Sequence, residues 1–374
     1  MTGSTSQNTF YFYRGRVALY ALLRTLNVDP GDEVIIQAFT CLAVPSPIVA
    51  LGLRPVYVDI DPRTYNADPV RVKCRITERT RVIIVQHTFG IPAPMDAIVA
   101  EARSRGLVVI EDCCHSLGST YQGKPLGCIG DAAFYSYEWG KPIVIGLGGT
   151  AVVHSEKLVQ RMRILYKTFV QPPLKDVARV NLQYFAHALL RRPALFWTIR
   201  EIYRALSKSG IVIGTFPREE FSGELSEEYQ RTMAPSLRVR LAGKLAKAEA
   251  GILHRKHVGA QYEDRFKQLG LPRPEAPRGS ETVYLQYPLV VRDKRRVLSE
   301  ARKWNVEVGD LFSSPVHPLT TQQWKSVGYE KGCCPIAEHT CVRIVSLPLH
   351  EAVRQGDIDR TFDFLQRIQR QSLI

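Results

Sequence analysis

Short runs of β-branched residues alternate with amphipathic stretches along the first half of this 374-residue chain. Strands interleaved with helices indicate βαβ units, and therefore a largely parallel sheet with helices on both faces. We therefore predict an α/β fold with a large, mainly parallel sheet. The predicted strands are 34–36, 56–60, 82–87, 108–111, 132–137 and 150–153, with helices such as 43–51 and 95–105 between them.

The strand pattern stops near residue 158 and returns only beyond residue 271. A chain of this length is too long for one small core, so we expect two units. The first is a large domain of residues 1–235. The second, residues 236–374, begins with one long helix over 235–269 and ends in a smaller α/β domain.

A basic helical insertion is predicted at about 160–230 within the large domain. Between 161 and 210 there are ten basic and two acidic residues, and two amphipathic helices parted near Pro193 are predicted within 180–207. Two interpretations stay open for these helices. They pack on the protein or on its dimer mate, or they touch an anionic membrane surface.

The net charge of +14 calls for an anionic partner. No helix-turn-helix, zinc-finger or aromatic RNA-binding signature accompanies the charge, so no nucleic-acid partner is predicted. Phosphorylated small molecules or an anionic membrane suit the charge equally well. No run approaches the roughly 18 apolar residues of a membrane span. Residues 1–10 lack the pattern of a signal peptide, so we expect a cytoplasmic protein, with peripheral contact at the inner membrane face as an option.

The eight cysteines contain no CxxC pair. A zinc ribbon and a thioredoxin-like site are therefore not indicated, and no metal is predicted. In a cytoplasmic chain the expected state of these cysteines is the buried free thiol.

Asp112 and His87 each follow an apolar strand run. Ligands of such sheets bind beyond the carboxyl ends of the strands, so both positions are candidates for a site. A carboxylate is costly to bury without a cationic partner, and the protonated ring nitrogen of pyridoxal phosphate (PLP) is such a partner. An ordinary helix N-cap is an equally good interpretation of Asp112 from spacing alone.

Lys141 follows another predicted strand and stands beside Trp139 and Gly140, away from any run of charge. A partly desolvated lysine has a lowered pKa and suits Schiff-base chemistry. Taken alone, a lysine is more often a solvated surface group, so this position needs its context.

That context is a series of motifs in a fixed order. The motifs are Gly31-Asp32-Glu33-Val34, Val56-Tyr57-Val58-Asp59-Ile60-Asp61, His87-Thr88-Phe89-Gly90, Pro94-Met95-Asp96, Glu111-Asp112, Gly123-Lys124, Gly130-Asp131 and Ser346-Leu347-Pro348-Leu349-His350. With these motifs at these spacings the sequence resembles the DegT/DnrJ/EryC1/StrS family of PLP-dependent sugar aminotransferases. The resemblance is dense over 15–153, weak over 160–230, and returns from about 233 to the end.

The resemblance implies a fold-type I homodimer that uses PLP. It would move an amino group from an amino acid, with glutamate as the expected donor, to a keto-sugar linked to a nucleotide. Lys141 falls at the position of the lysine that carries the cofactor and acts as base and acid in the proton shift. Asp112 falls at the carboxylate that pairs with the ring nitrogen, His115 near the phenolic oxygen of the cofactor, and Ser136 at a serine that contacts the phosphate.

The chain departs from the family pattern near the expected phosphate and ring. Arg14-Gly15-Arg16 stands where the family usually has Ser-Gly-Thr. Gly15 keeps a close backbone approach, Val17 can still donate its N–H, and Arg16 is predicted to bind the phosphate by a charge-assisted contact. The alternative is that Arg16 is a surface or dimer-contact arginine. Cys41 stands where an aromatic commonly stacks on the ring, so either the hold on the cofactor is weaker or another residue supplies the stacking.

Two further positions, Glu138 and His317, are predicted to face the substrate. Two alternatives to an aminotransferase stay open. A dehydratase-like member of the family is disfavoured because Lys141 is retained, where the dehydratases have histidine. A cofactor-poor regulatory or scaffolding homologue would use the basic insertion as a docking surface.

Overall fold

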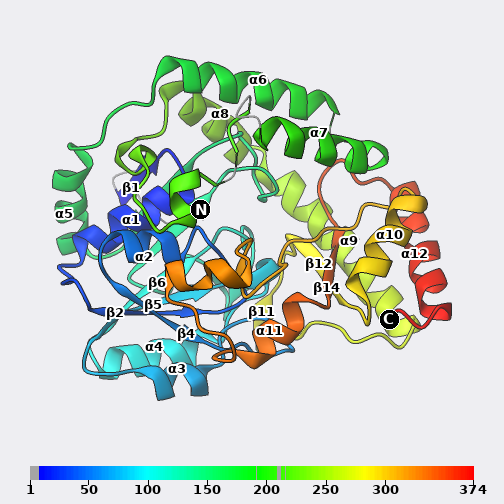
Figure 1. Cartoon of the computed structure of the whole chain (residues 1–374), viewed down its shortest axis with the longest axis horizontal. Coiled ribbons are helices and arrows are strands. Elements are labelled where there is room, and N and C mark those ends of the chain that lie inside the picture. The colour runs from blue at the N-terminus through cyan, green and yellow to red at the C-terminus, as the bar shows by residue number, and fades with distance from the viewer. Residues whose placement is uncertain (1–7, 191, 209–211, 215) are drawn as a thin grey trace.

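A seven-stranded sheet forms the core of the first half of the chain, at the left of Figure 1. The computed structural model describes residues 8–190, 192–208, 212–214 and 216–374. The five strands in the order β9-β6-β5-β2-β4 are parallel, and β10 and β1 extend the sheet antiparallel at one side. These strands confirm the predicted α/β fold. They are β1 (Thr9–Phe12), β2 (Glu33–Gln37), β4 (Arg54–Val58), β5 (Thr80–Gln86), β6 (Val108–Asp112), β9 (Ala132–Ser136) and β10 (Gly149–Val153).

Helices cover both faces of this sheet because successive strand side chains point to opposite sides. Ile84 of β5 packs in one core with α1, whereas Ile83 packs in a second core with α4. Burial on both faces explains why the strands appear in the sequence as continuous apolar runs. One face carries α1 (Gly15–Thr25), α2 (Pro45–Ala50) and α5 (Glu156–Tyr166), and the other carries α3 (Pro69–Arg75) and α4 (Met95–Ser104).

The predicted insertion consists of two helices that arch over the top of the molecule in Figure 1. They are α6 (Leu174–Leu190) and α7 (Phe196–Lys208), separated at Pro193 as predicted. Arg191, between them, lies outside the described residues. The single long helix predicted over 235–269 is wrong, because α8 (Pro235–Leu245) and α9 (Ala248–Gln268) are two helices. The break falls at Lys247, whose φ of −108° and ψ of 8° leave the helical region, and no proline or glycine marks it in the sequence.

The C-terminal part is built on a second, two-stranded antiparallel sheet of β12 (Gln286–Val290) and β14 (Ile344–Pro348). Helices α10 (Lys294–Lys303), α11 (Pro335–Cys341) and α12 (Gln355–Arg370) complete it. Two short strands from this part pair with the first half of the chain: β13 (Val316–His317) with β3 (Thr40–Cys41), and β11 (Ser280–Glu281) with β7 (Thr120–Tyr121), which also pairs with β8 (Lys124–Pro125). The division at residues 235 and 236 therefore stays a prediction.

All eight cysteines are free thiols, as predicted. Their predicted burial holds for Cys113, Cys114, Cys334 and Cys341, whereas Cys41 and Cys333 are half-buried and Cys74 and Cys128 are exposed. Within the described part of the chain, no helix combines the length and the apolar character needed to cross a membrane.

Candidate active site

The carboxyl ends of two neighbouring parallel strands bring the predicted site residues together. Asp112 is the last residue of β6 and Ser136 is the last residue of β9, while Lys141 lies in the turn that follows β9. The amine of Lys141 contributes to the pKa shifts of Cys41, Asp112 and His115, so it lies within electrostatic range of all three. Residues separated by 100 positions thus form one group at the edge of the sheet.

Asp112 is a buried carboxylate without a cationic side chain bound to it. Burial raises its pKa, and the hydrogen bonds from Cys114 and the charge of Lys141 only partly oppose that effect. One carboxylate oxygen accepts a hydrogen bond of 3.0 Å from the backbone N–H of Cys114. Asp112 forms no ion pair with any described residue. A protonated ring nitrogen would supply the missing cation, so this position fits PLP.

His115 is buried, and its Nδ1 atom has no hydrogen-bond partner among the described residues. Burial lowers its pKa well below 6.5, and the charge of Lys141 lowers it further, so the imidazole is neutral at pH 7. A buried polar atom without a partner costs free energy in the folded state. A ligand oxygen that is hydrogen-bonded to Nδ1 would recover that free energy. This agrees with the prediction that His115 lies near the phenolic oxygen of the cofactor.

The N-terminus of α1 abuts the end of β9 closely. A Cβ added at Gly15 would lie 2.8 Å from the Cβ of Ser136, so only glycine allows this approach. Arg14, the N-cap of α1, makes no side-chain cap, and the first turn of α1 holds no acidic residue. Helix N-termini of this kind bind phosphate groups, which supports the predicted phosphate position beside Gly15, Val17 and Ser136.

Arg16 meets a carboxylate instead of open solvent. Its guanidinium forms a buried ion pair with Glu220 of the insertion and lies 5.0 Å from the ring centroid of Phe216. The side chain is still near the site, because its charge contributes to the pKa of Cys41. Direct binding of a phosphate by Arg16 stays a prediction, and in this conformation the phosphate would share Arg16 with Glu220.

Arg14, for which the sequence suggested no role, is the centre of a second buried ion cluster. It lies 3.0 Å from a carboxylate oxygen of Glu138 and 2.6 Å from one of Glu228. Glu138, predicted to face the substrate, is buried and has one oxygen engaged by Arg14, so its predicted role is untested. The sequence does hold a signal for these partners. Five glutamates lie within 219–228, directly after the strongly basic stretch.

His317 lies beside Cys41, since β13 and β3 pair in parallel with these two residues as partners. Its Nδ1 is 2.9 Å from the hydroxyl of Ser313, and burial lowers its pKa to about 4. The predicted substrate residue from the C-terminal part is therefore brought to the Lys141 group, and it is neutral at pH 7. The ring centroid of Phe312 lies 6.4 Å from that of His317 and 4.3 Å from that of Phe39.

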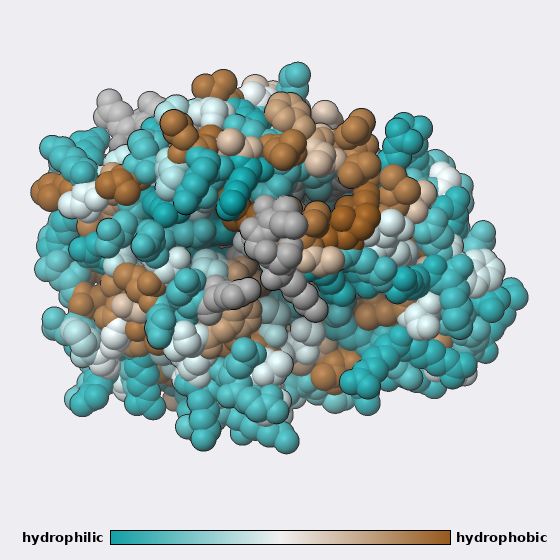
Figure 2. Space-filling model, turned by 45° about the horizontal axis from the view of Figure 1, so that its top comes forward, coloured by the Kyte–Doolittle hydropathy of each residue, from teal (hydrophilic) through white to brown (hydrophobic). Residues whose placement is uncertain are grey.

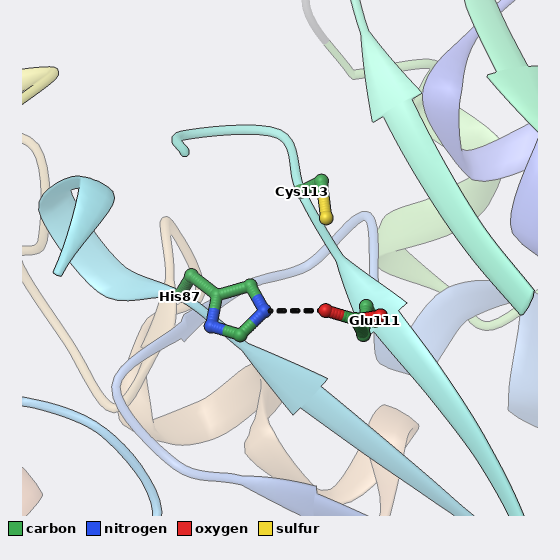
Figure 3. A group of neighbouring side chains, drawn as sticks. All are labelled: His87, Glu111 and Cys113. Atoms are coloured by element: carbon green, nitrogen blue, oxygen red, sulfur yellow. Dashed lines mark hydrogen bonds and ion pairs between the residues drawn. The ribbon is translucent and has the colours of Figure 1, made fainter. Parts of the chain in front are cut away.

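His87 belongs to a separate buried group with Glu111 and Cys113 (Figure 3). The ligand atoms of these three residues lie within 4.8 Å of one another, which is close enough to hold a metal ion. Their hydrogen bonds favour a structural role. Nδ1 of His87 accepts from the backbone N–H of Ala93 at 3.1 Å, so the neutral ring carries its proton on Nε2, 3.2 Å from Glu111. Glu111 also accepts the backbone N–H groups of Gly127, Ile129 and Gly130.

Glu111→Gln is expected to lower the free energy of unfolding by about 2–4 kcal/mol at pH 7. Burial alone would raise the pKa of Glu111, but the hydrogen bonds from His87 and the backbone amides outweigh it and lower the pKa. The stabilisation is therefore full above the unfolded pKa of about 4.3 and is lost as the pH falls through the lower folded pKa. Urea unfolding at pH 7 and pH 4 measures both effects.

The matched control is Glu78→Gln, an exposed glutamate, for which a change within about 0.5 kcal/mol is expected. If Glu111→Gln and the wild type have the same free energy of unfolding at pH 7, the pair of Glu111 and His87 contributes nothing to the stability of the fold.

The family model described as the DegT/DnrJ/EryC1/StrS aminotransferase family matches residues 11–178 and 239–366. The match includes strands of the seven-stranded sheet and both strands of the β12–β14 sheet. It leaves out residues 179–238, which include α7, in agreement with the weak sequence resemblance over 160–230. The chain belongs to this family and is an aminotransferase, and aminotransferases of the family depend on PLP.

Curated relatives cover nearly the whole chain. GDP-perosamine synthase of Caulobacter vibrioides is 39% identical over 361 residues, 95% of this chain and 84% of that protein. The UDP-2-acetamido-2-deoxy-3-oxo-D-glucuronate aminotransferase of Pseudomonas aeruginosa is 30% identical over 337 residues, 90% and 79% of the two chains. The solved aminotransferase from Psychrobacter cryohalolentis has the same fold, with a TM-score of 0.75, 21% identity, and coverage of 97% and 87%.

Proposed function

We propose that this chain binds PLP through Asp112, His115, Ser136 and the first turn of α1, with Lys141 as the residue that carries the cofactor. The observation that supports this most strongly is the buried carboxylate of Asp112, which has no cationic partner among the described residues and lies in electrostatic range of Lys141. When bound, the cofactor supplies an electron sink for the carbon that gains or loses the amino group.

The residues of the chain have distinct tasks in this proposal. Asp112 holds the proton of the ring nitrogen, because a buried carboxylate stabilises a cation strongly in a site of low dielectric constant. Neutral His115 positions the ring by a hydrogen bond from its buried Nδ1 edge. Lys141 has no ion-pair partner among the described residues, so its amine is available to remove and return a proton at the reacting carbon.

The proposed acceptor is a keto-sugar linked to a nucleotide, and the proposed donor is glutamate. The acceptor class is supported by the names of two relatives, a GDP-perosamine synthase and an aminotransferase of a UDP-linked 3-oxo sugar. Half-buried, neutral His317 beside Cys41 is the side chain that we propose to face the sugar. Arg16 and Cys41 are proposed to set how tightly the cofactor is held. A cytoplasmic homodimer without nucleic-acid or metal partners completes the proposal.

The test is the visible absorption of purified protein with PLP, followed by glutamate and then by a panel of keto-sugar nucleotides. Glutamate is expected to bleach the visible band of the bound cofactor, and one keto-sugar is expected to restore it. A band that no amino donor changes would favour the dehydratase-like alternative. Absence of any band would favour the cofactor-poor scaffold.

We also propose that α6 and α7 touch an anionic membrane surface through residues 180–207. The outer face of α6 exposes Leu182, Phe185 and Leu189, which are 72%, 66% and 76% exposed. Figure 2 shows hydrophobic side chains gathered on the face that carries these helices. An apolar stripe on a basic amphipathic helix is typical of helices that lie in the membrane interface.

Replacing Leu182 and Phe185 by glutamate is expected to reduce binding to phosphatidylglycerol vesicles at low salt by roughly tenfold or more. Both side chains are mostly exposed, so the fold should not change. Co-sedimentation measures the binding, and Leu253→Glu, an exposed leucine of α9, is the matched control that should bind like the wild type. If the wild type does not sediment with these vesicles, the membrane contact is wrong.

A further inference from the structure

An apolar cavity lies between the α6–α7 pair and the C-terminal part of the molecule. Its volume is about 400 Å³, within the range of small-molecule sites. Hydrophobic residues from four parts of the chain line it: Trp139 beside the active-site turn, Leu190 of α6, Ile199 and Leu206 of α7, and Leu285 and Leu349 of the C-terminal part. None of these residues has a task in the proposed transamination.

The cavity reaches the molecular surface on the side of the two helices. Leu190 and Ile202 both line it, and they are 42% and 54% exposed. The exposed apolar residues of α6, namely Leu182, Phe185 and Leu189, form an outer stripe on this helix. The neighbouring face of the same helix lines the cavity through Ala186 and Leu190. A molecule embedded in the surface that the stripe contacts can enter the cavity without crossing bulk water.

Two cavity-lining side chains hold donors without partners. Nε2 of Gln183 and Nε of Arg200 are buried and form no hydrogen bond among the described residues. Arg200 also lies 4.2 Å from the ring centroid of Trp197. Unpaired donors of this kind suit phosphate or ester oxygens. Among the other polar residues of the wall, Glu307 is paired with His350, and Arg255 donates a hydrogen bond to the carbonyl oxygen of Leu285. The rest of the wall is mainly apolar and does not suit a nucleoside diphosphate, whose polar groups would lose their hydrogen bonds to water.

From this combination we infer that the cavity binds one acyl chain of an anionic phospholipid. The inference rests on the proposed membrane contact of α6 and α7. The hydrocarbon chain lies among the apolar side chains, while Gln183 and Arg200 meet oxygens of the glycerol and phosphate. The acyl chain then packs on Trp139, which lies two residues before Lys141 and whose ring centroid is 4.8 Å from that of His187 in a tilted arrangement. Membrane contact is thereby coupled to the turn that holds the active-site lysine.

The experiment measures quenching of tryptophan fluorescence by phosphatidylglycerol vesicles whose acyl chains carry bromine. In the full-length protein, Trp139 is expected to be quenched, and Trp139→Phe should lose most of the quenching. Ala186→Phe fills the cavity and should reduce quenching at least threefold. The matched control Ala188→Phe lies on the same helix outside the cavity lining and should behave like the wild type.

Vesicle co-sedimentation and the visible band of bound PLP keep the proposals distinct. Ala186→Phe should sediment with the vesicles as Ala188→Phe does, and both should keep the cofactor band, so lost quenching reports the cavity alone. Quenching that survives in both Trp139→Phe and Ala186→Phe would overturn the inference, because the chains would then lie outside the cavity. Binding that proves equal for uncharged phosphatidylcholine vesicles would overturn the assignment to anionic lipid. If the protein does not bind vesicles and forms a dimer that covers this face, the inference is overturned, and the partner of this face is a second copy of the chain rather than a lipid.

Discussion

Lys141→Ala is expected to lower kcat/KM for amino transfer by at least about 10³-fold while the fold is retained. The amine is the group proposed to carry the cofactor and to move the proton, and no neighbouring side chain can replace it at that position. Lys141 is only half-buried and makes no ion pair with a described residue, so the loss of stability should stay below about 1 kcal/mol. Steady-state kinetics and thermal unfolding measure the two effects.

Lys124→Ala is the matched control, since Lys124 is an exposed lysine of β8. Its activity should equal that of the wild type. Added methylamine should restore part of the activity of Lys141→Ala, because a free amine can act as the missing base. A Lys141→Ala enzyme that keeps more than a tenth of the activity would show that Lys141 is not the catalytic base.

Arg14→Met is expected to reduce the free energy of unfolding by about 3–5 kcal/mol at pH 7, the largest stability effect that we predict. Arg14 is 1% exposed and binds Glu138 and Glu228. Burial alone would lower its pKa, but the two carboxylates outweigh burial and raise it, so the guanidinium is always charged. Its removal leaves two buried carboxylates without their counter-charge.

The pH dependence separates this effect from a packing defect. In the wild type the charge of Arg14 lowers the pKa of Glu228 against the opposing effect of burial. In Arg14→Met, only the smaller effects of Arg16 and Arg231 still oppose burial, so the folded pKa of Glu228 is expected to rise relative to that in the wild type. The variant should therefore gain stability relative to wild type as the pH falls below about 5. Denaturant unfolding between pH 4 and pH 8 measures the difference in the free energy of unfolding between Arg14→Met and the wild type.

Two companion variants complete the Arg14 experiment. Arg14→Met with Glu228→Gln should recover part of the lost stability, since one uncompensated charge is removed. Arg24→Met, an exposed arginine of the same helix, should change stability by no more than about 0.5 kcal/mol. A pH-independent loss in Arg14→Met would mean that side-chain packing, not charge, is what Arg14 contributes.

The sequence by itself determined the parallel α/β sheet and the group of Lys141, Asp112 and His115. These features depend on local information: apolar runs that are buried on both faces, and polar residues that directly follow them. Once the strands are parallel and adjacent, their carboxyl ends must meet, so residues far apart in sequence come together. The roles of these residues are predictions from the family motifs, and the family itself is confirmed.

Only the tertiary structure decided the partners of Arg14 and Arg16, the break between α8 and α9, and the cavity behind α6. The sequence shows that two arginines replace two hydroxyl residues, but not that Glu220 and Glu228 bind them from 204 and 214 residues away. A buried cation needs a counter-charge, and which carboxylate supplies it depends on how the insertion packs on α1. Spacing along the chain carries no such information, because contacts between distant segments are fixed by packing of the whole fold.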